Sequence, residues 1–236
     1  MTNPWLSHEY EQIFQHIYRA HARVIILCSA TKQSGCSTIA LWLAQRCANQ
    51  QSTLLVELDL CGAGLGYSPI EWQNTTEHHI AHSENLFILP QPRSAQSILQ
   101  LRQQDQLQLY LNLWQQYYEF IVIDLGAVNN KHWRQLSACN LSKISDIAIL
   151  SVALGKTTQE ELLEAIDVLK KGQLPLLGCI ANQFYNPSLQ QKLLNSLQSY
   201  QKILPTKLFH FLEQKIKHNH FLRGINNELS FVSTAI

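Results

Sequence analysis

Methionine, glycine and charged residues are scarce in this chain of 236 residues, which has one Met, nine Gly and 15% Asp, Glu, Lys and Arg. Its 18 basic and 17 acidic side chains give a net charge of +1, too small to attract a nucleic acid or an anionic membrane. No apolar run reaches the roughly 20 residues that cross a bilayer, and the start of the chain does not resemble a signal peptide. We therefore expect a cytoplasmic protein that binds no nucleic acid and is recruited to the inner face of the cytoplasmic membrane only through a partner.

Cysteine and histidine also lack a metal-binding pattern. The six cysteines stand singly, without the paired spacing of a zinc site or the density of a disulfide scaffold, which indicates reduced thiols. His78, His79 and His82 lie together in a polar segment, but no Cys pair accompanies them. That pattern favours a solvated loop over a metal site.

Short, continuous apolar runs rich in β-branched residues are what the sequence does contain. Runs of this kind are typical of buried parallel strands, and they occur at 24–28, 53–58, 120–124, 147–152 and 176–181, with a shorter one at 85–89. Segments with helical spacing separate them, at 37–49, 95–117, 158–171 and 187–200. This alternation predicts an α/β fold with a doubly wound, mostly parallel sheet and helices on both faces.

The length and composition bound the number of domains. A hydrophobic content of 46% over 236 residues is enough for one core and too little for two large domains. Residues 1–22 predict an N-terminal amphipathic helix, and 207–219 predict a further helix. We expect 23–236 to form a single α/β domain.

The loop after the first predicted strand carries the clearest candidate site, because ligands of open α/β sheets bind beyond the carboxyl ends of the strands. The P-loop pattern G-x-x-x-x-G-K-[ST] matches Gly35 and Ser37, but it meets Ala30 at its first glycine and Cys36 at its lysine. The backbone N–H groups of 34–38 and the helix dipole would still hold an anion. The missing ammonium removes a charge on which rapid phosphoryl transfer depends.

Lys32 offers a substitute for the missing charge. It lies four positions before Cys36, and its flexible side chain could reach the same phosphates, although a solvated loop lysine is the plainer alternative. The candidate nucleotide-binding residues of this loop are Lys32, Gln33, Ser34, Gly35, Cys36, Ser37 and Thr38.

Acidic residues end two further strands. Asp124 closes the 120–124 run, where a Walker B aspartate would reach Mg²⁺ through water. Glu57 and Asp59 end the 53–58 run, one residue apart and on the same face. Each acid alone would be interpreted as a turn or helix-capping residue, but ligand-type residues at three strand ends favour one shared site. We predict Mg²⁺ ligands at Ser37, Glu57, Asp59 and Asp124, and catalytic roles for Asp59, Asp124 and Lys32.

Together these segments resemble the MinD/ParA type of P-loop ATPase, and within it the bacterial tyrosine autokinases (BY-kinases) of capsule and exopolysaccharide export. Residues 29–40 are similar to their Walker A stretch S-A-x-P-G-E-G-K-S-T-x-A, and 118–124 to their Walker B pattern Y-D-F-I-I-I-D. Residues 57–60 resemble the Walker A′ pattern D-x-D-[LR], with Glu57 in place of the first aspartate. The resemblance implies that Asn182, which ends a later matching segment, contacts an adenine ring.

Two departures from these kinases bear on activity: Cys36 replaces the Walker lysine, and no tyrosine cluster lies near the end of the chain. The resemblance therefore implies a weak or inactive nucleotide-binding component of exopolysaccharide biosynthesis and export, regulatory or scaffolding in role, with ATP or ADP and Mg²⁺ bound weakly or not at all. It also implies a homodimer and protein partners in an envelope polysaccharide or surface-appendage system.

Three alternatives stay open. The chain could be an active ATPase or tyrosine kinase that uses Lys32 or a residue from a partner. It could instead be an assembly or localisation factor for pili, flagella or cellulose secretion, since several such relatives carry an aberrant P-loop. A third hypothesis is an α/β domain that binds no nucleotide.

Overall fold

An eight-stranded sheet organises the part of the chain that the computed structural model describes, which is residues 3–72, 78–183, 189–200, 205–218 and 229–233. The strand order is β3-β4-β2-β5-β1-β6-β7-β8. The pairs between β4 and β7 are all parallel, whereas β3 and β8 are antiparallel edge strands. The strands are β1 (Val24–Ser29), β2 (Thr53–Glu57), β3 (Ile80–Ala81), β4 (Leu86–Leu89), β5 (Phe120–Ala127), β6 (Ile147–Ala153), β7 (Leu176–Asn182) and β8 (Leu229–Ser233).

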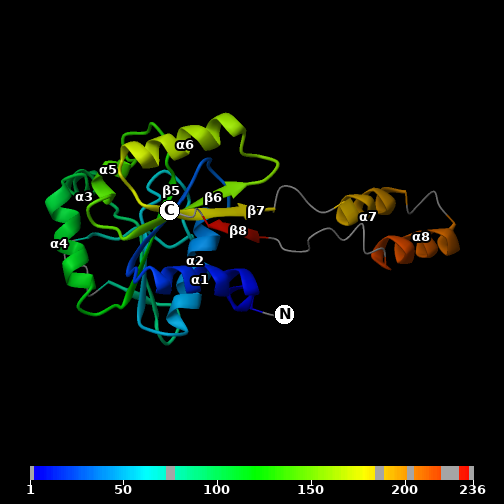
Figure 1. Ribbon diagram of the computed structural model, residues 1–236, viewed down its shortest axis with the longest axis horizontal. Helices are drawn as coiled ribbons and strands as arrows, with labels where there is room; N and C mark the ends of the chain where they lie inside the picture. The colour runs from blue at the N-terminus through cyan, green and yellow to red at the C-terminus, as the bar shows by residue number, and fades with distance from the viewer. Residues whose placement is uncertain (1–2, 73–77, 184–188, 201–204, 219–228, 234–236) are drawn as a thin grey trace.

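Helices cover both faces of this sheet (Figure 1). On one face lie α1 (His8–Arg19) and α2 (Cys36–Ala48), and on the other α3 (Ala95–Leu101), α4 (Gln104–Trp114), α5 (Ala138–Leu141) and α6 (Gln159–Lys171). The predicted mostly parallel, doubly wound α/β fold is therefore confirmed. The two short antiparallel edge strands were not predicted.

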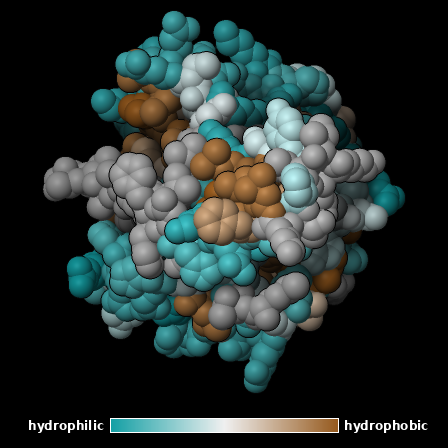
Figure 2. Space-filling view, turned by 90° about the vertical axis from the view of Figure 1, so that its right-hand side faces the viewer, coloured by the Kyte–Doolittle hydropathy of each residue, from teal (hydrophilic) through white to brown (hydrophobic). Residues whose placement is uncertain are grey.

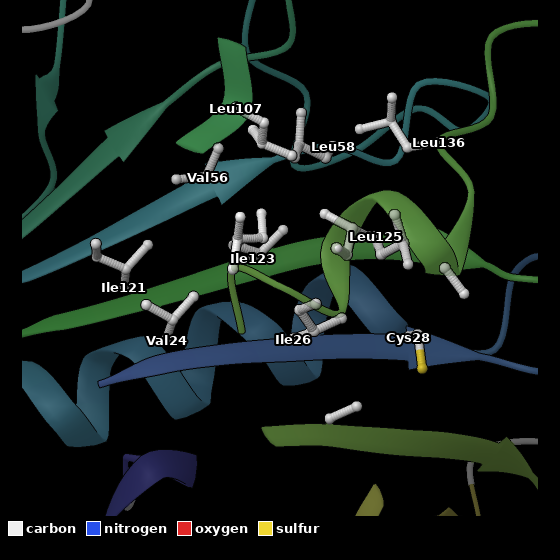
Figure 3. Close-up of a cluster of buried hydrophobic side chains, with 14 of the residues drawn as sticks. Val24, Ile26, Cys28, Val56, Leu58, Leu107, Ile121, Ile123, Leu125 and Leu136 are labelled. Carbon is white, nitrogen blue, oxygen red and sulfur yellow. The ribbon is translucent and has the colours of Figure 1, made fainter. Parts of the chain in front are cut away.

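Each face of the sheet has its own core. Val24, Ile26 and Cys28 of β1 point into the core beneath α3 to α6, part of which Figure 3 shows. Ile25 and Leu27 alternate with them and pack against α1 and α2. A strand that is apolar on both sides needs such a double cover, which explains the continuous apolar runs in the sequence.

The segment predicted as one helix, 95–117, forms two. Its backbone is extended at Gln103, between α3 and α4. A continuous helix would carry Asp105 onto the face that buries Ile98 and Leu101, because residues three, four and seven apart share a helix face. The break places Leu107 in the core instead.

The first helix, α1, is amphipathic and joins the core through Tyr10, Ile13, Phe14 and Ile17. Glu11 and Arg46 of α2 form an ion pair of 2.7 Å, and the Arg46 guanidinium carbon lies 3.9 Å from the centre of the Phe14 ring. These contacts fix α1 against α2.

Between β7 and β8 the chain forms α7 (Leu189–Ser199) and α8 (Thr206–His218), which lie side by side and agree with the predicted helices (Figure 1). Gln190 Nε2 joins them by donating to the backbone oxygens of Ile216, at 2.8 Å, and Lys217, at 3.0 Å. This pair faces the viewer in Figure 2, where hydrophobic residues gather near the centre among hydrophilic ones. The helices of the described ranges include none with the length and apolar character needed to cross a membrane.

Candidate functional site

The candidate site lies where the connections after β1 and β5 leave the sheet on opposite faces. Helix α2 follows β1 on one face, and α5 follows β5 on the other. In open α/β sheets, ligands bind beyond the carboxyl ends of strands at such a reversal. The loop after β1, residues 30–35, and Asp124 on β5 both lie at this place.

The loop after β1 is held in place through its carbonyl oxygens. Asn182 at the end of β7 donates from Nδ2 to the oxygen of Ser34 at 2.8 Å. Lys156, in the loop after β6, donates from Nζ to the oxygens of Lys32 at 2.6 Å and Gln33 at 3.3 Å. None of these three contacts uses an N–H group of the loop.

Gly35 ends the loop and caps α2 with a left-handed backbone, at φ +82°. A Cβ at this position would lie 2.5 Å from Asn182 Nδ2, so the glycine allows both the turn and the close approach. The next N–H groups, those of Cys36, Ser37 and Thr38, belong to the first helical turn and have no acceptor within the helix. The adjacent Ser34 hydroxyl is buried and has no hydrogen-bond partner among the described residues.

Asp124 meets the start of α2 inside the protein, with none of its surface exposed. Burial raises the pKa of Asp124 to about 6, the Asp59 charge adds to the rise, and the Ser37 hydroxyl and Cys36 thiol oppose it. Oδ1 accepts a hydrogen bond from Gly126 N at 3.2 Å. Oδ2 is buried and has no partner within ordinary hydrogen-bond distance in the described chain.

The thiol at the lysine position carries no charge. Burial raises the pKa of Cys36 well above its usual value, and the negative charge of Asp124 raises it further. Cys36 is therefore a neutral thiol at physiological pH. The structure thus places Cys36, Ser37 and Asp124 together, as the motifs predicted, with sulfur where a P-loop enzyme has an ammonium.

Glu57 ends β2 directly beside Asp124, because the two residues pair in the sheet. Its Oε1 accepts a hydrogen bond from Leu65 N at 2.5 Å, while Oε2 is buried without a partner among the described residues. Burial raises the pKa of Glu57 to about 7, and the charges of Asp124 and Asp59 contribute. Glu57 therefore organises the loop that follows β2.

Asp59 lies over β5. Burial raises its pKa, whereas hydrogen bonds from the N–H groups of Cys61 and Gly62, and the Lys32 charge, lower it. A Cβ added at Gly126, which has φ +67°, would lie 2.3 Å from Asp59 Cγ. The charge of Lys32, the predicted substitute cation, thus acts on the Asp59 carboxylate.

The oxygen ligands of this site fit Mg²⁺ better than a softer metal. No group of three or more His, Cys, Asp or Glu in the described ranges is arranged to hold a metal ion. Ser37 and the unpartnered oxygen of Asp124 are hard donors, and Mg²⁺ usually takes only one or two protein ligands, with water and phosphate completing its shell. Mg²⁺ would therefore depend on a bound phosphate.

His79 and His82 lie within hydrogen-bond distance of tyrosine hydroxyls. His79 Nδ1 lies 2.7 Å from the Tyr118 hydroxyl, and His82 Nδ1 lies 3.1 Å from that of Tyr67. Burial lowers the pKa of His79 to about 4, so this residue is not the fully solvated loop histidine that the sequence indicated.

Comparisons with known proteins bear on the fold. No family model matches the sequence, and no curated protein is similar to it by sequence. Among solved structures, the BceF tyrosine kinase domain is 20% identical over 73% of this chain and 74% of its own, with a TM-score of 0.63. The kinase domain of the Escherichia coli tyrosine kinase ETK is 16% identical over 72% of each chain, with a TM-score of 0.60.

A ParA family ATPase from Chlorobium tepidum is 14% identical over 84% of this chain and 99% of its own, with a TM-score of 0.52. The chain has the fold of these P-loop proteins. The predicted resemblance to BY-kinase domains and ParA-type ATPases is thereby confirmed at the level of the fold.

Sequence reasoning missed two residues of the site. Gly126 gives Asp59 the space that it occupies, and Lys156 contacts the P-loop backbone. A signal for the second was present, because Lys156 lies in the connection between the predicted strand 147–152 and the predicted helix 158–171, at a strand end.

Proposed function

We propose that this chain is a nucleotide-binding P-loop protein with weak or no turnover, which acts as a regulatory or scaffold component of bacterial exopolysaccharide biosynthesis and export. The observation that carries the proposal is Cys36, a buried neutral thiol at the position of the catalytic lysine and beside the Walker B-type Asp124. Such a site keeps the shape of a P-loop and loses the charge that stabilises phosphoryl transfer.

Nucleotide binding is supported by what the loop retains. Lys156 and Asn182 bind carbonyl oxygens of the loop, and these contacts do not use the N–H groups at the start of α2. The buried Ser34 hydroxyl and Asp124 Oδ2, both without partners in the described structure, suit a phosphate and a magnesium ion respectively. Asn182 is a proposed adenine contact, although one of its amide protons already binds Ser34.

A role in polysaccharide export rests on the resemblance of the motifs to the BY-kinases, and the BceF and ETK domains of similar fold are tyrosine kinases. A scaffold works through partners, so we also propose a homodimer and protein partners in an envelope assembly system. Light scattering of the purified chain, with and without ATP, tests for the homodimer.

An active ATPase is the second candidate, and the position of Lys32 favours it. Its charge lowers the pKa of Asp59, an acid of the proposed site. In that case Lys32→Ala abolishes phosphate release, whereas in the scaffold it leaves the basal rate unchanged. A phosphate-release assay on the two proteins separates the candidates.

The decisive experiment combines titration calorimetry with ATP, ADP and Mg²⁺ and the phosphate-release assay. We expect binding without appreciable turnover. Cys36→Lys should tighten ATP binding about tenfold, because an ammonium near the phosphates is worth about 1.4 kcal/mol or more. Cys36→Ala is the matched control, since it removes the thiol without adding charge.

Two results contradict the proposal. Absence of ATP and ADP binding in both the wild-type chain and Cys36→Lys refutes a phosphate-binding loop. Turnover at the rate of an ordinary ParA-type ATPase refutes the weak or inactive site. Circular dichroism of both variants confirms that they fold.

A further inference from the structure

The ammonium that contacts the P-loop belongs to Lys156 rather than to Lys32. Lys156 Nζ lies 2.6 Å from the Lys32 carbonyl oxygen, and 3.3 Å and 3.5 Å from the oxygen and Oε1 of Gln33. The charge of Lys32 acts instead on Asp59 and Cys61. A cation from the neighbouring strand connection therefore lies against a P-loop that lacks its own.

A tight turn after β6 fixes the backbone of Lys156. Thr157 N and Lys156 N both donate to the oxygen of Ala153, at 2.8 Å and 3.1 Å, and Gly155 has φ +79°. Thr157 Oγ1 accepts from Ala153 N at 3.1 Å and lies 3.2 Å from Thr31 Oγ1. The turn is thus fastened both to its own strand and to the P-loop.

Because Lys156 binds carbonyl oxygens of the loop, its charge also affects the N–H groups of the same peptide units. The described peptide bonds are all trans, so the N–H of each unit points opposite to its C=O. A charge on the oxygens of Lys32 and Gln33 therefore polarises the N–H groups of Gln33 and Ser34, and polarised donors bind an anion more strongly.

We propose that Lys156 replaces the missing P-loop lysine electrostatically, as a positioning residue that strengthens the loop N–H groups for the phosphates of a nucleoside di- or triphosphate. This rests on the proposed nucleotide binding. Lys156 belongs to the connection after β6, and its charge acts on the phosphate site indirectly, by polarising the peptide groups of the loop. Its effect therefore falls on binding of the charged ligand.

The test is calorimetric titration of the full chain with Mg-ATP, Mg-ADP and adenosine. Lys156→Met should weaken Mg-ATP binding about tenfold, the effect of one charge at moderate distance, and should leave adenosine binding unchanged. Lys156→Arg should retain most of the affinity because it keeps the charge. Lys170→Met, an exposed lysine on α6, is the control for removal of one positive charge and should not alter binding.

The outcomes distinguish this inference from the proposed function. Equal Mg-ATP affinity in Lys156→Met, Lys170→Met and the wild-type chain overturns the role of Lys156 and leaves nucleotide binding intact. Equal loss of ATP and adenosine binding in Lys156→Met shows a merely structural role and also overturns it. If the wild-type chain binds neither nucleotide, the proposed function fails, and this inference fails with it.

Discussion

The loops that follow β1 and β2 differ in how their backbone N–H groups are bonded. In the loop after β1, side chains from elsewhere bind carbonyl oxygens, with Asn182 on Ser34 and Lys156 on Lys32. In the loop after β2, Gln91 Nε2 likewise donates to carbonyl oxygens, those of Asp59 and Gly62. In addition, Glu57 Oε1 at the end of the strand accepts a hydrogen bond from Leu65 N. The contacts of Asn182 and Lys156 thus use carbonyl oxygens of the first loop, whereas in the second loop a carboxylate of the protein binds a backbone N–H group.

The two loops therefore favour ligands of opposite charge. N–H groups at a helix start favour phosphate, whereas neighbouring acids with raised pKa values favour a proton or a metal ion. Each of Glu57, Asp59 and Asp124 has a raised pKa, with burial as its largest cause. In the proposed function, the two loops supply complementary halves of a site for a phosphate and its magnesium ion.

The largest effect on stability should come from filling the space that Gly126 leaves for the Asp59 side chain. In Gly126→Ala, the new Cβ meets the Asp59 carboxyl group, and the alanine must also adopt φ +67°. We expect a loss of about 3 kcal/mol in the free energy of unfolding, the range for a steric clash combined with backbone strain. Urea denaturation measures it.

Gly66→Ala is the matched control for that variant. Gly66 also has positive φ, at +87°, but a Cβ there meets nothing within 4 Å. Only the conformational cost of about 1 kcal/mol should remain. Equal losses in the two alanine variants would show that Asp59 does not depend on the space at Gly126.

The next effect comes from the buried charge of Asp124, whose pKa is raised from 3.8 to about 6. Between these values the folded chain binds the proton more tightly than the unfolded chain, so stability falls as the pH rises through 6. Asp124→Asn has no charge to bury and should be about 2 kcal/mol more stable than the wild-type chain at pH 8, with no advantage at about pH 4. It should also lose Mg²⁺-dependent nucleotide binding.

Urea denaturation of the ligand-free proteins at both pH values checks this expectation. Asp167→Asn, on the exposed surface of α6, removes the same charge and should change stability little. A destabilised Asp124→Asn at pH 8 would contradict the assignment of Asp124 as a buried charge that serves a ligand at the expense of stability.

The sequence predicted the sheet and the position of the site better than it predicted the contacts. Continuous apolar strands and polar strand ends are local patterns, so β1, β2 and β5 and the grouping of Cys36 with Asp124 followed from them. The contact of Lys156 with Lys32 joins residues far apart in sequence and depends on strand order, which no local pattern encodes. The break at Gln103 likewise depends on which residues the core accepts.

The smallest effect should come from loosening the bond between the first loop and the turn after β6. Thr157→Val keeps the shape of the side chain but removes the oxygen that accepts from Ala153 N at 3.1 Å and lies 3.2 Å from Thr31 Oγ1. We expect a loss of about 1 kcal/mol in stability and about threefold weaker ATP binding, because Lys156 loses part of its fixed position. Thr31→Val removes only the contact between the two hydroxyls, so it should weaken ATP binding less than Thr157→Val. If Thr157→Val destabilised the chain and left ATP affinity unchanged, the turn after β6 would support the fold alone. Its contacts with the loop after β1 would then have no part in phosphate binding.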